Sequence, residues 1–232
     1  DIVYINYYLL SRSYYRQQIA TRYPDIIFPE YKPDTPINSY ISDFIVQNEK
    51  HTSITSDVEL PGISGYWVPS GLVYVYYSTI EAIPDRQLIL DKNNRLWQTF
   101  SDPLSGSLGK FKHLLLSDVL RYYADHALTV ARAYSLVGKF EDSQRFMTYA
   151  INWEVNLRVD AYKPYIDQLI DKKECSPARV GLDALYIKWG DDFVILEMYH
   201  NYIRVCGVND EQVRSLDDKY QKLKPVFDAP VK

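Results

Sequence analysis

The feature that most constrains the fold of this chain is a change in its hydrophobic pattern near residue 112. Before it, short apolar runs alternate with helical segments and with loops rich in glycine and proline; from Lys112 onward the pattern is helical. Apolar side chains that recur every three or four positions predict amphipathic helices, and short connections favour antiparallel neighbours. We therefore expect six or seven helices, roughly over 112–137, 140–154, 160–173, 178–189, 191–206 and 209–223.

Within this helical part, small and aromatic side chains recur in a defined order. Small residues let two antiparallel helices approach closely, aromatic rings fill the gap between them, and a glycine permits the tight turn because it reaches positive φ cheaply. This pattern resembles a tetratricopeptide repeat, with departures at Ala127, where a large aromatic is usual, and Val155, where proline is usual. An ordinary helical bundle is the alternative. The positions expected to pack the repeat are Ala131, Tyr134, Gly138, Phe140, Ser143 and Ala150.

The first 110 residues predict a different architecture. Strand, helix, helix and strand in succession favour parallel pairing through right-handed crossovers. Residues 72–77 are the most strand-like segment, after a loop punctuated by Gly62, Gly65, Pro69 and Gly71. The remaining elements are expected as strands at 2–6, 26–28, 52–55 and 88–90, helices at 9–23 and 36–50, and a turn at 91–94.

These patterns together predict two domains. Residues 1–110 should form a small α/β domain with a mostly parallel sheet and helices. Residues 111–232 should form an all-α tetratricopeptide-like helical array. The segment 101–109, rich in Ser, Gly and Pro, is the expected junction.

Polar side chains gather near the expected carboxyl end of the first strand. They are Asp1, Asn6, Tyr14 and Tyr15. In open α/β sheets, ligands bind outside the carboxyl ends of the strands. Asn6, Tyr14 and Tyr15 are therefore candidate ligand or interface residues.

Composition excludes some classes of function. The net charge of −4 lacks the basic field expected of a nucleic-acid binder, so we expect no nucleic-acid partner. The 22 tyrosines suit half-buried packing, or alternatively a carbohydrate or peptide surface lined by rings. Sequence alone cannot show that Cys175 and Cys206 approach closely enough for a disulfide, and we expect two free, mostly buried thiols.

No chemical motif is complete. Phosphate-loop, nucleophile-elbow and zinc-ligand spacings are absent, and Asp191-Asp192 suits a helix cap better than an acid–base pair. The four histidines, none in metal-ligand spacing, are His51, His113, His126 and His200. We therefore predict no catalytic, cofactor-binding or metal-binding residues.

Two segments carry a family resemblance. Residues 1–15 (Asp1 to Asn6, Leu9-Leu10, Ser13 to Tyr15) and 69–74 (Pro-Ser-Gly-Leu-Val-Tyr) are similar to stretches of polytopic GT-C-type membrane glycosyltransferases. These proteins are protein O-mannosyltransferase-like and related to transmembrane protein 260. Tyr14 stands where tryptophan is common, and residues 78–111 match nothing in that pattern.

The resemblance implies a part without catalytic residues. Family members transfer sugar from a polyprenyl-phosphate donor, and their expected catalytic acid lies in the membrane-embedded part. This chain would be an extracytoplasmic auxiliary domain that serves acceptor recognition, partner docking or bracing, with that membrane part and a protein or peptide acceptor as partners. Because the chain enters a strand directly at Asp1, we expect a fragment of a longer protein.

Two other functions stay open at this point. A free-standing tetratricopeptide-type module would bind a peptide in its helical groove. A small α/β enzyme with a helical appendage would need a catalytic arrangement that the sequence does not display.

Overall fold

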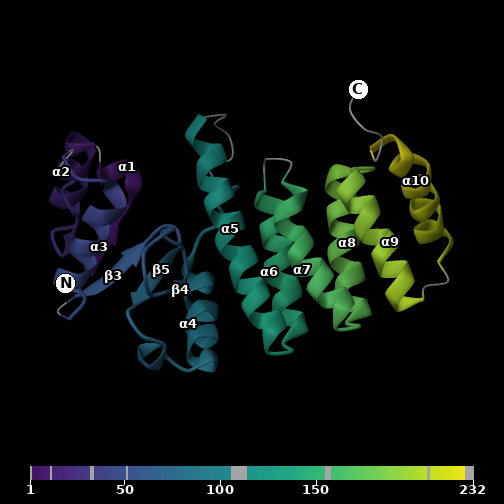
Figure 1. Ribbon diagram of the computed structural model, residues 1–232, viewed down its shortest axis with the longest axis horizontal. Coiled ribbons are helices and arrows are strands. Elements are labelled where there is room, and N and C mark those ends of the chain that lie inside the picture. The colour runs from purple at the N-terminus through teal and green to yellow at the C-terminus, as the bar shows by residue number, and fades with distance from the viewer. Residues whose placement is uncertain are drawn as a thin grey trace. The chain divides into compact units, whose positions relative to one another are not determined.

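The computed structural model describes residues 2–10, 12–31, 34–50, 52–105, 114–154, 158–207 and 210–227 (Figure 1). The chain divides into two compact units, residues 1–100 and 101–232. The predicted boundary between residues 110 and 111 lies outside the described residues. Each unit is described by itself.

Unit 1 combines a five-stranded sheet with helices. The strands are β1 (Ile2–Ile5), β2 (Ile26–Ile27), β3 (Ser53–Ser56), β4 (Tyr66–Ser70) and β5 (Val73–Tyr77). The helices are α1 (Tyr7–Leu10), α2 (Ser13–Arg22), α3 (Ile37–Asn48) and α4 (Arg86–Thr99), with a 3-10 turn at Ile80–Ala82. The small α/β unit with helices is thus as predicted.

The sheet is mixed, so the prediction of a mostly parallel sheet was wrong. Its strand order is β2-β1-β3-β5-β4; β1 pairs in parallel with β2 and β3, whereas β5 is antiparallel to both β3 and β4. The reason is a two-residue hairpin link at Gly71-Leu72, where Gly71 has φ +67°. Asn93 fixes this link: its Oδ1 accepts from the Gly71 amide at 2.8 Å, and its Nδ2 donates to the Pro69 carbonyl at 2.8 Å.

Four local predictions in unit 1 also fail. The expected strand at 88–90 and turn at 91–94 both lie inside α4, which Asp85 caps by accepting from the Gln87 amide at 2.7 Å. Residues 66–70, expected in a loop, form β4. The expected single helix over 9–23 is two helices, interrupted at Arg12, whose φ of −128° and ψ of 82° are not helical.

The core of unit 1 lies between β1, β3 and α3. Its buried side chains come from alternate strand positions, from one face of α3, from α1 and from the loop after β3. They are Val3, Ile5, Leu10, Ile41, Ile45, Ile54 and Leu60.

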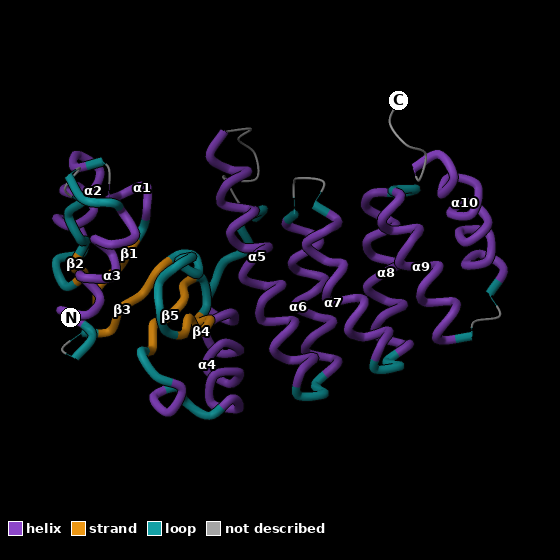
Figure 2. The backbone as a smooth tube through the Cα atoms, in the orientation of Figure 1, coloured by secondary structure: helices purple, strands orange, loops and turns teal. Residues whose placement is uncertain are grey.

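Unit 2 is all-helical in its described residues, as predicted. Its helices are α5 (Leu114–Leu136), α6 (Phe140–Trp153), α7 (Val159–Asp171), α8 (Cys175–Trp189), α9 (Phe193–Cys206) and α10 (Glu211–Phe227). Consecutive helices stand side by side in Figure 2. Beyond contacts between sequence neighbours, α5 contacts α7, α7 contacts α9, and α6 contacts α8. The helices therefore stack in two layers, one with α5, α7 and α9 and the other with α6 and α8.

A disulfide joins Cys175 to Cys206, so the expectation of free thiols was wrong. Cys175 is the first residue of α8 and Cys206 the last of α9. The antiparallel hairpin of these helices brings the two Cα atoms to 5.9 Å, inside the range that a disulfide needs. The bridge closes the open end of this hairpin.

Candidate functional site

A polar cluster lies where β1 and β3 end. Asn6 follows β1 and Asp57 follows β3, and because these strands are parallel neighbours, the two residues meet at one edge of the sheet. Asn6 Nδ2 donates to Asp57 Oδ2 at 2.6 Å, and Asn6 Oδ1 accepts from the Leu9 amide at 3.0 Å. Asn6 therefore caps α1 and holds the carboxyl at the same time.

The environment of this cluster perturbs its titration. Burial raises the pKa of Asp57 to about 6, against the lowering effect of hydrogen bonds from Ser56 and Asn6. Burial and the nearby charge of Asp57 raise the pKa of Tyr4 to about 12. Asp57 is a carboxyl that changes protonation near neutral pH, at the strand end where α/β sheets bind ligands.

The two tyrosines predicted to lie beside Asn6 are on α2, and no hydrogen bond described here joins them to Asn6. Tyr14 and Tyr15 are on α2, 65% and 46% exposed, with ring centroids 5.6 Å apart in an edge-to-face arrangement. Gln18 Nε2 donates to the Tyr14 hydroxyl at 2.7 Å, whereas Asn6 bonds with Asp57 and Leu9. Asp1, the fourth polar residue of that prediction, lies outside the described residues.

Asp57 is the residue that the sequence analysis missed. Its signal was available: an aspartate two positions beyond the expected strand at 52–55, which should reach the same edge as Asn6. The cluster of Tyr4, Asn6, Ser56 and Asp57 offers one titrating carboxyl with hydrogen-bond donors and acceptors. It can bind a polar group, but it does not pair an acid with a base or a nucleophile.

The residues expected to pack a repeat lie on α5, on α6 and in the turn between these two helices. Ala131, Ser143 and Ala150 are all 0% exposed and Tyr134 is 2% exposed, while Phe140 is partly buried. Gly138 has φ +75°, and a Cβ there would meet no atom within 4 Å, so backbone conformation rather than crowding requires glycine.

Hydrogen bonds tie these small residues to the next helix. Ser143 Oγ donates to the Ala131 carbonyl at 2.7 Å and lies 2.6 Å from the Tyr165 hydroxyl of α7. The Tyr162 hydroxyl, also on α7, donates to the Ala150 carbonyl at 3.1 Å. Three successive helices are therefore joined through buried polar groups as well as by apolar packing.

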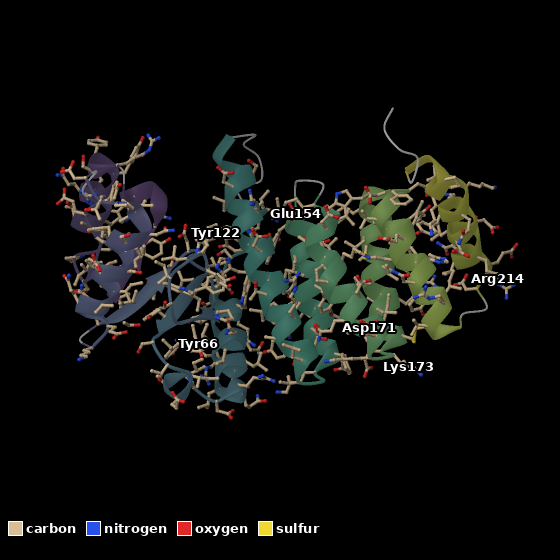
Figure 3. The ribbon with its side chains drawn as sticks, viewed as in Figure 1. Tyr66, Tyr122, Glu154, Asp171, Lys173 and Arg214 are labelled. Carbon is tan, nitrogen blue, oxygen red and sulfur yellow. A yellow bond between two sulfur atoms is a disulfide. The ribbon has the colours of Figure 1, made fainter. Side chains whose placement is uncertain are left out.

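An ion network fixes the junction between α6 and α7. Glu154, labelled in Figure 3, has a side chain that is 0% exposed and pairs with Arg158. Arg158 Nη2 also donates to Asp125 Oδ1 of α5 at 2.7 Å. These carboxylates hold the pKa of Arg158 above its usual range although burial opposes it. A buried pair with this geometry positions the helices rather than performing chemistry.

A groove lies between α6 and α8, on the layer that contains these two helices. It encloses about 430 Å³ and is lined by Thr148, Ile151, Asn152, Ala184, Ile187 and Lys188. Ile187 is 85% exposed. Lys188 Nζ donates to the carbonyls of Ile151 and Asn152, so the one cation in this lining is already occupied.

The other sequence candidates have structural roles. Asp192 caps α9 by accepting from the Val194 amide at 2.9 Å, while Asp191 pairs with Lys219 at 2.8 Å. His126 is buried, which lowers its pKa to about 4, and His200 Nδ1 lies 2.6 Å from Asp217. His51 and His113 lie outside the described residues. Within the described ranges, no group of three or more His, Cys, Asp or Glu side chains could hold a metal ion.

Comparisons with family models, curated proteins and solved structures gave no match. The resemblance to membrane glycosyltransferases therefore rests on the motif residues alone. None of the helices in the described part of the chain is both long and apolar enough to cross a bilayer.

Proposed function

We propose that this chain is a docking domain without catalytic residues of its own, on the extracytoplasmic side of a membrane-embedded glycosyltransferase. The α6–α8 groove is the observation that carries the docking role. Its lining is mainly apolar, its one cation is already bound to carbonyls, and Ile187 stands exposed beside it. Contiguous exposed apolar surface that is rimmed by polar residues marks interaction sites on proteins.

The groove favours a particular kind of occupant. An acidic or phosphorylated peptide would need free cations, which this lining does not offer, whereas an apolar segment would bury the exposed side chain of Ile187. The proposed occupant is an apolar segment of the membrane-embedded part of the same polypeptide. In this arrangement the helical unit braces the catalytic part or positions its acceptor.

In this proposal, a tetratricopeptide-like array forms the scaffold of the groove. The buried small residues at 131, 143 and 150, the left-handed turn at Gly138 and the two-layer contacts are those that such repeats use. Since stacked repeats bury their faces against neighbours, one layer keeps a free surface for a partner.

Two further observations support the location and the parent. Disulfides persist in oxidising compartments, so Cys175–Cys206 favours the extracytoplasmic side. The motif segments have defined structural roles: Asn6 caps α1, and the Pro69–Gly71 turn is held by Asn93. These roles give a physical reason for a family to keep both segments.

The test compares the isolated chain with its parent. Each is given a polyprenyl-phosphate-linked sugar and an acceptor peptide, and transfer is expected only from the parent in membranes. In the parent, Ile187→Glu should reduce transfer, whereas Val46→Glu, at a 67% exposed position of α3, should not. Sugar transfer by the isolated chain, or equal effects of the two variants, would overturn the proposal.

The second candidate is a free-standing peptide-binding module, which the same groove favours. It predicts that the isolated chain binds a soluble partner with no membrane segment present, and that Ile187→Glu abolishes this binding. A gene that encodes several hydrophobic spans before this chain would instead support the first proposal.

A further inference from the structure

Unit 1 contains a cavity whose lining is not explained by the proposed function. It encloses about 250 Å³ between the β4–β5 hairpin and α4. The residues that carry the argument are Val68, Val75, Tyr77, Leu88, Lys92 and Arg95.

The apolar wall of the cavity follows from the register of the hairpin. Val68 and Val75 are direct partners across β4 and β5, and Tyr77 lies two positions beyond Val75, so all three point to one face of the sheet. The opposite face carries Trp67 and Tyr76, which pack against the core. Helix α4 contacts β4 and leaves part of the first face uncovered, where Leu88, at 62% exposure, lines the cavity.

The rim of the cavity is cationic. Lys92 and Arg95 lie three residues apart on α4, so they project from the same side of the helix. Both are exposed, and neither forms an ion pair with a carboxylate of the described residues. The nearest acids along the chain are engaged otherwise: Asp91 accepts from Gln87 Nε2 at 2.6 Å, and Asp85 caps α4. Two cations next to an apolar wall are therefore available to a ligand.

From these contacts we infer that the cavity binds a small amphipathic anion, an apolar ring or branched chain that carries a carboxylate or phosphate. The valines and Leu88 would cover the apolar body, Lys92 and Arg95 would pair with the charged group, and the Tyr77 hydroxyl would offer a hydrogen bond. The cavity is smaller than the 300–1,000 Å³ that is usual for drug-sized ligands, so the ligand is a fragment of about one or two rings. This inference does not depend on the glycosyltransferase proposal.

The test uses a matched pair of probes on the whole chain. Binding of 2-naphthoate and of neutral 2-naphthylmethanol is titrated by fluorescence, and backbone amide shifts are recorded for each. The naphthoate should bind more tightly, its shifts should map to β4, β5 and α4, and its affinity should fall with added salt. Inorganic phosphate at the same concentration should not displace it, because phosphate lacks the apolar body.

Variants separate the two halves of the site. Lys92→Gln with Arg95→Gln should weaken naphthoate binding about five- to tenfold, as expected for two exposed charge contacts, and leave naphthylmethanol unchanged. Val75→Thr, nearly the same shape, should weaken both probes. Lys50→Gln, the same charge change at an exposed position of unit 1, is the control and should alter neither. Thermal unfolding of each variant verifies its fold.

Three results would overturn the inference: equal affinity of the two probes, unchanged naphthoate binding in the double variant, or amide shifts outside β4, β5 and α4. Displacement of naphthoate by inorganic phosphate would likewise refute the amphipathic character of the site.

Discussion

Replacement of Asp57 by asparagine should stabilise unit 1 at alkaline pH and leave it unchanged at acid pH. Burial raises the pKa of Asp57 from 3.8 to about 6, so the native state binds this proton more tightly than the unfolded state does. The protonated Asp57 carboxyl therefore contributes its full stabilisation of the folded state below pH 3.8, and this contribution is lost as the pH rises through about 6. Asparagine cannot ionise, yet its Oδ1 can still accept from Asn6 Nδ2, which keeps the cap of α1.

The size of the effect follows from the shift. A rise from 3.8 to about 6 is about 2.2 pKa units, or about 3 kcal/mol at 1.36 kcal/mol per unit. Asp57 is only partly buried, and solvent screening reduces this ceiling to about 1–2 kcal/mol. The variant should exceed the wild type in free energy of unfolding by that amount at pH 8, and by nothing measurable at pH 3.5.

The assay is urea unfolding at pH 3.5, 5, 6 and 8, followed through amide resonances of β1 and β3 so that unit 1 alone is reported. Asp43→Asn, at an exposed position of α3, is the control and should differ from the wild type by less than about 0.5 kcal/mol at each pH. If the difference in free energy of unfolding between Asp57→Asn and the wild type does not change with pH, the raised pKa of a buried Asp57 carboxyl is refuted.

Three further predictions concern unit 2. Ala150→Leu forces a larger side chain into a position with 0% exposure and should lower the free energy of unfolding by about 1–3 kcal/mol in urea melts. Arg158→Met removes the ion pair between Arg158 and the buried Glu154 carboxylate and should cost about 3–5 kcal/mol, most of which Glu154→Gln in the same chain should restore; a loss below about 1 kcal/mol would contradict a buried ion pair at this junction. Burial lowers the pKa of His126 to about 4. The neutral ring therefore stabilises the folded state above pH 6.5, and this contribution is lost as the pH falls from 6.5 through 4. His126→Gln should flatten that part of the pH profile of the melting temperature in thermal melts.

Sequence periodicity predicted the helices of unit 2 well because each carries a long apolar stripe. The sequence also predicted α3, from apolar residues at every third or fourth position, and β1, from a short apolar run. The small residues predicted to pack there, Ala131, Ser143 and Ala150, are buried, and Gly138 has a positive φ; whether they pack a tetratricopeptide-like repeat stays a prediction.

Other features depend on contacts that periodicity does not express. α4 was missed because Leu88-Ile89-Leu90 is too short an apolar run to distinguish strand from helix, and the cap at Asp85 decided it. The antiparallel β4–β5 hairpin depends on Asn93, which lies more than 20 residues from the turn that it holds. Asp57 became a site residue only when β3 was placed beside β1, and the disulfide only when α8 was placed against α9.

The state of Cys175 and Cys206 in the cells that make this protein tests the central claim most directly. Intact cells are treated with a membrane-impermeant maleimide, with and without prior treatment by a membrane-impermeant phosphine, and the mass added to the peptides that contain Cys175 and Cys206 is measured. The account predicts no labelling of Cys175 and Cys206 without the reductant and labelling of both after it, as expected for a formed bridge on the proposed extracytoplasmic side. Thiols that are already free in freshly lysed cells, or that stay out of reach of the external reagents after reduction, would contradict it.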